Sequence, residues 1–207
     1  MIGSAVRGIL RAMAYETELV RKARDGDRRA FDRLVELHLP QVWATVWRVL
    51  RHHEDTEDVV QEVFVTAHRA LSGFRGDAKL STWIFRISKN HCINRLKYLK
   101  RRGRGRSDNY AEANELAIND SVGAPVKPDE VLEASREREW VHRAIAELAE
   151  DQRMLVALRD IEGLSYEEIV EITELPEGTV KSRLHRAREK LAGILERLEA
   201  EAVHRGE

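Results

Sequence analysis

The sequence predicts an all-α protein of two small helical domains joined by a flexible acidic linker. Three observations lead to this fold class. Aromatic residues make up 6% of the chain and there are only 4 Pro, while Ala, Leu, Glu and Arg abound, which favours helix. Apolar residues recur at helical spacing in two long stretches. Between them, residues 103–129 combine Gly103, Gly105, Gly123, Pro125 and Pro128 with polar side chains, as linkers do.

The first domain is expected over residues 15–102. Helices are predicted over 16–24, 28–51 and 55–71, and a fourth begins at Ser81 or Thr82 as its cap and runs to about 102. The turn Asp25-Gly26-Asp27 separates the first two, and Pro40 is expected to kink or divide the second. The third helix has the clearest buried stripe, which consists of Val60, Val63, Phe64, Ala67 and Leu71.

The second domain is expected over residues 130–198, with helices over 130–148, 151–161, 166–173 and 179–198. Ser165 and Glu168 have the spacing of a capping box. A short turn with Gly178 then leads into a basic helix. The capped helix, the turn and the basic helix together indicate a helix-turn-helix. An ordinary pair of helices with a basic solvated face is the alternative. The side chains predicted to face the core are Val180, Leu184, Ala187 and Leu191, and those predicted to face outward are Lys181, Ser182, His185, Arg186 and Arg188.

Charge is balanced overall but segregated along the chain. The 35 Lys+Arg and 36 Asp+Glu give a net charge of −1. However, no acidic residue lies between Asp77 and Asp108, a stretch that holds ten basic ones. A run of one sign this long suggests a polyanionic partner, with a basic solvated face as the plainer reading.

Several protein classes are excluded at this stage. No apolar run approaches the ~20 residues that span a bilayer, so we expect no membrane insertion. A single cysteine, Cys92, rules out a disulfide framework and a cysteine-built metal site, and the expected compartment is the cytoplasm. Two roles are considered for Cys92, that of a small buried hydrophobic residue and that of a redox sensor.

The predicted third helix has an acidic side opposite its buried stripe. Asp58 and Glu62 lie one turn apart, and like charges at this spacing destabilise a helix. Such a face calls for a cationic partner or a metal ion. The metal reading would need carboxylates from a second helix. The comparable cluster of Glu167, Glu168 and Glu171 lies across the linker, so a protein interface is favoured and a carboxylate metal enzyme is the minor alternative.

Three blocks of residues together resemble the extracytoplasmic-function sigma factors of the sigma-70 family, the compact class that keeps only regions 2 and 4. The first runs from Asp55 to Phe64. The second is Phe74-Arg75-Gly76-Asp77 followed by Thr82 to Ile87 and Asn90. The third runs from Asp160 to Leu191 and includes Gly178-Thr179-Val180-Lys181-Ser182-Arg183. The resemblance covers residues 15–102, as region 2, and 130–195, as region 4.

The resemblance implies a role for particular residues. Core RNA polymerase, through the clamp helices of its β′ subunit, would bind Asp58, Gln61 and Glu62. A base flipped out of the −10 promoter element would be held by Leu71, Phe74 and Asn90, with Trp83 beside them and Arg86 on the backbone. Contacts to the −35 element would come from Arg159, Lys181, Ser182, His185 and Arg186. Lys181 and His185 depart from some relatives, which carry Arg and an aromatic residue at these positions. The ammonium of Lys is a point charge, whereas the guanidinium of Arg can donate two parallel hydrogen bonds, so base selection at Lys181 is expected to be looser.

The function implied is that of an alternative sigma factor, which is not itself an enzyme and needs no cofactor or metal. Its partners would be core polymerase, promoter DNA and an anti-sigma factor. The linker is long enough, because some 27 residues extend to ~90 Å and the two promoter elements lie ~70 Å apart. Its acidic residues, Asp108, Glu112, Glu115 and Asp120, suit a segment threaded through channels built for nucleic acid, or a solvated tether. A stand-alone helix-turn-helix regulator is the main alternative.

Overall fold

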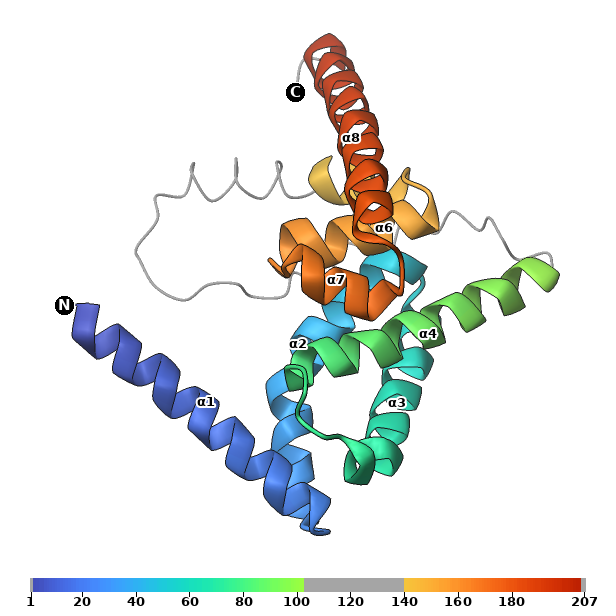
Figure 1. The fold of residues 1–207 in the computed structure, drawn as a ribbon. Coiled ribbons are helices and arrows are strands. Elements are labelled where there is room, and N and C mark those ends of the chain that lie inside the picture. The colour runs from blue at the N-terminus through green and yellow to red at the C-terminus, as the bar shows by residue number, and fades with distance from the viewer. Residues whose placement is uncertain (1, 103–139, 206–207) are drawn as a thin grey trace.

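A computed structural model describes residues 2–102 and 140–205, and these are helical with no strand among them (Figure 1). The N-terminal half consists of α1 (Ile2–Arg24), α2 (Arg28–Leu50), α3 (His53–Ala70), the 3₁₀ turn η1 (Leu71–Gly73) and α4 (Leu80–Arg101). The C-terminal half consists of a helix over 140–146, α6 (Glu150–Val156), the π-helical turn η3 (Ala157–Ile161), α7 (Tyr166–Thr173) and α8 (Glu177–Arg205). The all-α prediction is confirmed, and the predicted linker lies outside the described residues.

The turn between α1 and α2 forms as expected. The Asp27 side chain accepts hydrogen bonds from the Arg29 and Ala30 amides and caps α2, and Gly26 takes the left-handed conformation that ends α1. One prediction for this half is wrong, because α4 begins at Leu80 after Lys79, with no side-chain cap from Ser81 or Thr82. Of the two outcomes expected at Pro40, division of the helix does not occur, because Pro40 lies inside a continuous α2. The first helix also starts earlier than residue 16.

The core of the N-terminal half forms where α2, α3 and α4 meet. Val59 and Val63 are fully buried, and the predicted stripe from Val60 to Leu71 is buried along its whole length. Ile84 of α4 is buried against it, with Trp83, Ile87 and Leu96 partly buried beside it. Burying a side chain of this size contributes about 1.5–3 kcal/mol, so this seam fixes how α3 and α4 are rotated. The polar side of α3 therefore faces outward.

The capping box predicted for α7 is confirmed. The Ser165 hydroxyl accepts from the Glu168 amide at 3.2 Å, and the Glu168 carboxylate accepts from the Ser165 amide at 2.8 Å. The turn to the next helix differs from the prediction, because Gly178 lies within α8 and the left-handed residue that ends α7 is Glu174. Val180, Leu184 and Ala187 are buried as expected.

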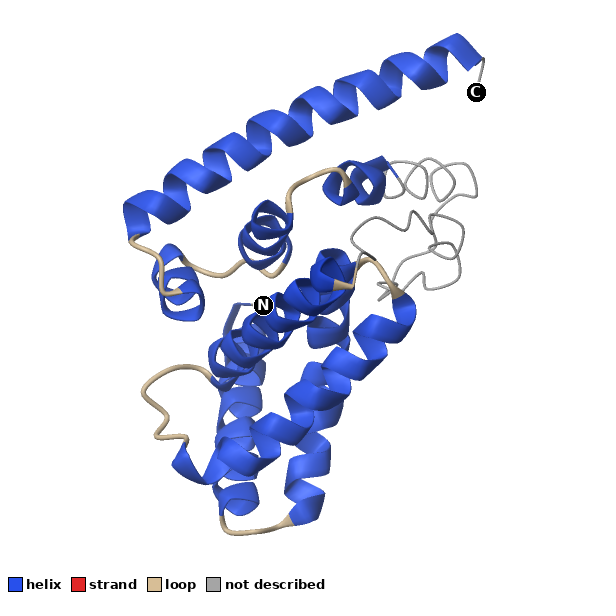
Figure 2. Ribbon diagram, turned by 90° about the vertical axis from the view of Figure 1, so that its right-hand side faces the viewer, coloured by secondary structure: helices blue, strands red, loops and turns tan. Residues whose placement is uncertain are grey.

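The two halves lie against each other. α7 packs on α4 and α6 packs on α2, so that both lie between α8 and the N-terminal helices (Figure 2). The sequence pattern gave no sign of this contact.

Candidate nucleic-acid and polymerase interface

The acidic face of α3 presents three adjacent exposed side chains, those of Asp58, Gln61 and Glu62. They lie on the side of the helix opposite the buried stripe, as the pattern predicted. The carboxylates are not isolated, because α4 supplies a partner for each. Arg95 donates from its Nη2 to Asp58 Oδ2 at 2.5 Å, and His91 Nδ1 lies 3.0 Å from Glu62 Oε2.

Arg95 joins this face to the interior of the domain. Its Nε donates to Asp55 Oδ1 at 2.7 Å, and the Asp55 side chain is only 11% exposed while that of Asp58 is 58% exposed. Burial acts to lower the pKa of Arg95, but the two carboxylates outweigh it and the pKa lies above its usual value. One guanidinium thus links a buried carboxylate to an exposed one.

His91 has a second contact on α3. Its Nε2 lies 2.9 Å from the Thr66 hydroxyl while Nδ1 meets Glu62. Both ring nitrogens are therefore occupied by α3, and the ring fixes the position of the Glu62 carboxylate. Sequence reasoning missed Arg95 and His91 as supports of the acidic face, although Arg95 is one of the ten basic residues it singled out and His91 lies in the same stretch without acidic residues.

The residues predicted to hold a flipped base lie around the connection between α3 and α4. Leu71 is 3% and Phe74 8% exposed, and the Phe74 and Trp83 rings lie 5.2 Å apart at 46°. In this conformation Leu71 and Phe74 are part of the core, and no base can reach them without a movement of the loop over 74–79. That loop contains Gly76, which adopts a positive φ of +81°.

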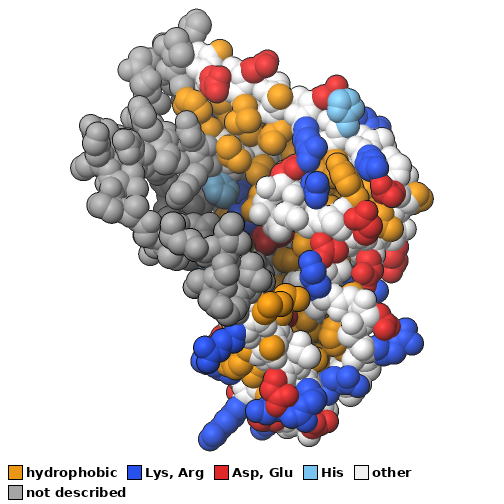
Figure 3. All heavy atoms as spheres, turned by 60° about the vertical axis from the view of Figure 1, so that its left-hand side comes forward, with side chains coloured by type: hydrophobic (Ala, Val, Ile, Leu, Met, Phe, Trp, Pro, Cys, Tyr) orange, Lys and Arg blue, Asp and Glu red, His pale blue; other side chains and the backbone are white. Residues whose placement is uncertain are grey.

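The polar members of the same set are more accessible. Asn90 is exposed and Arg86 is half-buried, one helical turn apart on α4. Lys97 is exposed on the same side of the helix, seven residues further on. This side of α4 can receive a phosphate backbone as it stands. Lysine and arginine side chains also gather toward the lower end of the face drawn in Figure 3, a view turned toward the α1 side of the molecule.

The predicted −35 residues lie on α8 and on η3, and two of them, Arg159 and Lys181, meet over the ring of Tyr166, a residue that the sequence pattern did not single out. Arg159 lies over the Tyr166 ring at 4.6 Å, and Lys181 Nζ lies 5.2 Å from the centre of the same ring. Arg159 also donates to the Leu164 carbonyl at 2.6 Å. An aromatic residue at the start of the supporting helix, close to basic positions, was the available signal.

The remaining members of the set are exposed on α8. Ser182, His185 and Arg186 lie on the outer side, opposite Val180 and the other buried residues. Arg186 Nε is held by the Ser182 carbonyl at 3.3 Å. A helix carrying short polar and basic side chains on its free face can enter a major groove, where an arginine pairs two acceptors of guanine.

The same part of the chain bears on the metal and membrane alternatives. Within residues 2–102 and 140–205, no group of three or more His, Cys, Asp or Glu side chains is placed to hold a metal ion. Glu168, from the second acidic cluster, is engaged by the Ser165 amide and by Lys79. No described helix is both long and apolar enough to cross a bilayer.

Two family models match the chain. The model of sigma-70 region 2 matches residues 34–102, and that of sigma-70 region 4 matches residues 138–191. The first match accounts for the acidic helix and the block around Trp83, which a stand-alone helix-turn-helix regulator would leave unexplained. The second covers the helix-turn-helix.

Characterised relatives agree with these matches. The chain is 40% identical over 176 residues to the ECF RNA polymerase sigma-E factor of Escherichia coli, covering 84% of this chain and 90% of the relative. It is 37% identical over 188 residues to the RNA polymerase sigma-H factor of Pseudomonas aeruginosa, covering 90% and 97%.

Solved structures show the same fold. The sigma factor RpoE of Bartonella quintana, solved with the anti-sigma factor NepR, is similar with a TM-score of 0.62 and 25% identity over 80% of this chain and 96% of that one. CnrH, solved with the cytosolic domain of CnrY, is similar with a TM-score of 0.61 and 25% identity over 88% and 97%. From the two region matches, the relatives and the fold, we conclude that the chain belongs to the extracytoplasmic-function class of the sigma-70 family, alternative sigma factors that direct RNA polymerase to promoters.

Proposed function

We propose that this sigma factor docks on core RNA polymerase through the exposed acidic face of α3, formed by Asp58, Gln61 and Glu62. The observation that carries this proposal is the contrast between the two sides of α3. One side is a continuous buried stripe, and the other presents two carboxylates and an amide to solvent. Like charges one turn apart are tolerated where they serve a cationic partner, as the β′ clamp helices are expected to be.

The −10 element is assigned to α4 and the loop before it. Asn90 and Arg86 would take the first contacts to the strand, since Asn90 is exposed and Arg86 half-buried. The base itself would need Leu71, Phe74 and Trp83, which form a pocket after the loop moves. Extruding a base costs a few kcal/mol, and a shaped apolar pocket recovers it by stacking. Melting would thus be coupled to a local change in this domain.

The −35 element is assigned to the helix-turn-helix. Arg186, Ser182 and His185 face outward on α8, and Arg159 and Lys181 flank them across the Tyr166 ring. We assign base reading to Arg186 because its guanidinium can pair two acceptors of guanine at once. We assign a phosphate to Lys181, whose ammonium is a point charge.

The decisive experiment is run-off transcription with purified core polymerase and the promoter upstream of the chain's own gene. Transcripts from that promoter that require the full-length chain are expected. Holoenzyme with Arg186→Ala should lose its preference at one −35 base pair by ~1–3 kcal/mol, whereas Lys181→Ala should weaken all sequences equally and lower the salt slope by about one. An equal loss on every duplex with Arg186→Ala would leave it an electrostatic role only.

Two further assignments rest on the family. An anti-sigma factor is proposed as a partner, because both similar structures were solved with a second protein, named as an anti-sigma factor in the RpoE structure. The chain is proposed to have no enzymatic activity of its own and to act in the cytoplasm with polymerase. Co-purification with tagged chain from its own cells should recover core polymerase and any such partner.

A further inference from the structure

The two carboxylates assigned to docking are matched by two side chains of the neighbouring helix. Asp58 and Glu62 lie one turn apart on α3, and His91 and Arg95 lie one turn apart on α4. Because α4 runs opposite to α3, His91 meets Glu62 and Arg95 meets Asp58. The register between the two helices therefore supplies one support for each docking carboxylate.

Each support holds only one oxygen of its carboxylate. Arg95 bonds Asp58 Oδ2 and His91 bonds Glu62 Oε2, and no hydrogen bond from the described residues reaches Asp58 Oδ1 or Glu62 Oε1. The second oxygen of each is thus available to a donor of a partner. A side chain that is already fixed loses less conformational entropy when the partner binds, so this arrangement favours docking.

Arg95 is itself held from the interior of the domain. Its side chain is 22% exposed, and its Nε donates to Asp55 Oδ1 at 2.7 Å. The other oxygen of Asp55 lies 3.2 Å from His52 Nδ1, so this buried carboxylate is fixed on both sides. A guanidinium is a planar, rigid fork. Anchoring Nε at Asp55 therefore sets the direction in which Nη2 points to Asp58.

His91 is held by a hydroxyl of α3. An ionised carboxylate only accepts hydrogen bonds, so Nδ1 carries the hydrogen that Glu62 accepts at 3.0 Å. In the neutral ring Nε2 is then an acceptor, and the Thr66 hydroxyl, 2.9 Å away, donates to it. Thr66 lies one turn after Glu62 on α3. This hydroxyl therefore selects both the tautomer and the orientation of the ring that holds Glu62.

We propose that Arg95 and His91 are positioning residues of the polymerase interface, which hold Asp58 and Glu62 with one oxygen each directed at the partner. The proposal rests on the docking face proposed above and adds the residues of α4 that determine how long the complex lasts. Encounter with a cationic partner depends on the charge of the face, whereas loss of a fixed geometry shortens the life of the complex. The two effects are separable by kinetics.

Two variants of the full chain remove the supports without changing its charge. Arg95→Lys keeps the cation, but an ammonium cannot reproduce the fork, and the buried Asp55 should retain it in preference to Asp58. Thr66→Val removes the hydroxyl that orients His91. Both should keep native helicity by circular dichroism. With purified core polymerase, each should associate at the wild-type rate and dissociate about two- to twelvefold faster, the loss expected when one side chain regains its freedom.

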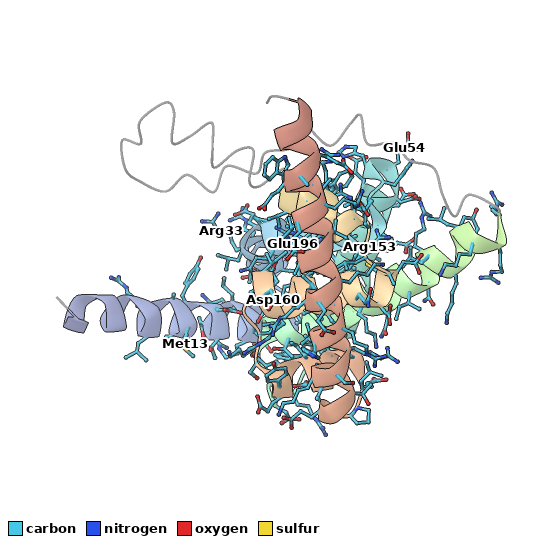
Figure 4. All side chains as sticks on the ribbon, turned by 90° about the horizontal axis from the view of Figure 1, so that it is seen from above. Met13, Arg33, Glu54, Arg153, Asp160 and Glu196 are labelled. Atoms are coloured by element: carbon cyan, nitrogen blue, oxygen red, sulfur yellow. The ribbon has the colours of Figure 1, made fainter. Side chains whose placement is uncertain are left out.

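Two comparisons show whether the effect passes through the carboxylates. Asn94→Ala, at an exposed position beside Arg95, is the matched control and should leave both rates unchanged. Glu54, marked in Figure 4, is an exposed carboxylate at the start of α3 that α4 does not hold. In double-mutant cycles, Arg95→Lys should lose most of its effect beside Asp58→Ala and keep all of it beside Glu54→Gln.

The outcomes separate this proposal from the docking assignment. A wild-type dissociation rate for Arg95→Lys or Thr66→Val would overturn the role of the support concerned. If Asp58→Ala weakens binding while both support variants dissociate like the wild type, docking through α3 stands and positioning by α4 fails. If Asp58→Ala binds like the wild type, the docking assignment fails. A faster dissociation of Arg95→Lys would then reflect a contact of its own, which would also overturn its positioning role.

Discussion

Asp55 and Asp58 share one arginine and should respond differently to the same substitution. Arg95 donates to both carboxylates, but the Asp55 side chain is 11% exposed and that of Asp58 is 58% exposed. Replacing each in turn with asparagine removes one charge and keeps the shape. The prediction is that Asp55→Asn damages folding and Asp58→Asn damages docking on polymerase.

The magnitudes follow from exposure. An exposed ion pair contributes ~0.2–1 kcal/mol, so Asp58→Asn should lower the melting temperature by no more than ~4 °C. A charge-assisted hydrogen bond in a mostly buried site contributes ~1.5–3 kcal/mol, and breaking it leaves Arg95 partly unpaired. For a chain of this size, Asp55→Asn should therefore lower the melting temperature by ~3–12 °C.

Docking should show the opposite order. Loss of one carboxylate from a polar interface should weaken core binding by at least ~1.4 kcal/mol, a factor of ten, for Asp58→Asn. The folded fraction of Asp55→Asn should bind nearly normally, because its side chain is buried. Thermal unfolding followed by circular dichroism and equilibrium binding to labelled core polymerase measure the two effects. Equal loss of stability in the two variants, or wild-type affinity for Asp58→Asn, would refute the division of roles.

Three further outcomes are expected. Asn90→Ala, an exposed site, should leave core binding unchanged and yield little permanganate-reactive open complex, and a normal open complex would count against the pocket. Ser165→Ala removes the α7 cap and should cost ~1 kcal/mol in urea unfolding, while Ser165→Asp should retain the cap. In the folded chain, burial raises the pKa of the Cys92 thiol to about 12, whereas the thiol of the unfolded chain has a pKa of about 9. The unfolded state then binds fewer protons, so stability should fall between pH 9 and 12 relative to Cys92→Ala, and parallel pH curves for the two proteins would contradict this.

Local patterns accounted for most of the helices and for the outward face of each site. The buried stripe of α3, the cap of α2 by Asp27 and the Ser165 capping box each depend on residues within a turn or two. Helical periodicity therefore placed Asp58 and Arg186 on free surfaces without knowledge of the fold. The same reasoning could not decide between a kink and a division at Pro40, and packing of α2 on α3 and α4 keeps the helix continuous despite one missing hydrogen bond.

Contacts between distant segments were beyond sequence reasoning. Arg95 lies 37 residues from Asp58, and Glu162 lies 117 residues from Thr45. Nothing in a local pattern selects these partners among the many charged residues of the chain. The burial of Phe74 has the same origin, since its loop is shaped by Trp83 and by the tie between Lys79 and the C-terminal half.

Pairing within the chain also bears on which side chain of α8 reads a base. Lys181 Nζ lies 2.6 Å from Glu177 Oε1, and this pair raises the pKa of the lysine. To contact a phosphate, Lys181 must exchange one anion for another, and solvent screening makes its exposed pair with Glu177 weak. Within the described residues, the only hydrogen bond of the Arg186 side chain is to the Ser182 carbonyl of its own helix. Most donors of its guanidinium are therefore available, and Arg186 can pair with guanine without first giving up an acidic partner. For Lys181, the net gain in binding is only the difference between its interaction with the phosphate and its interaction with Glu177.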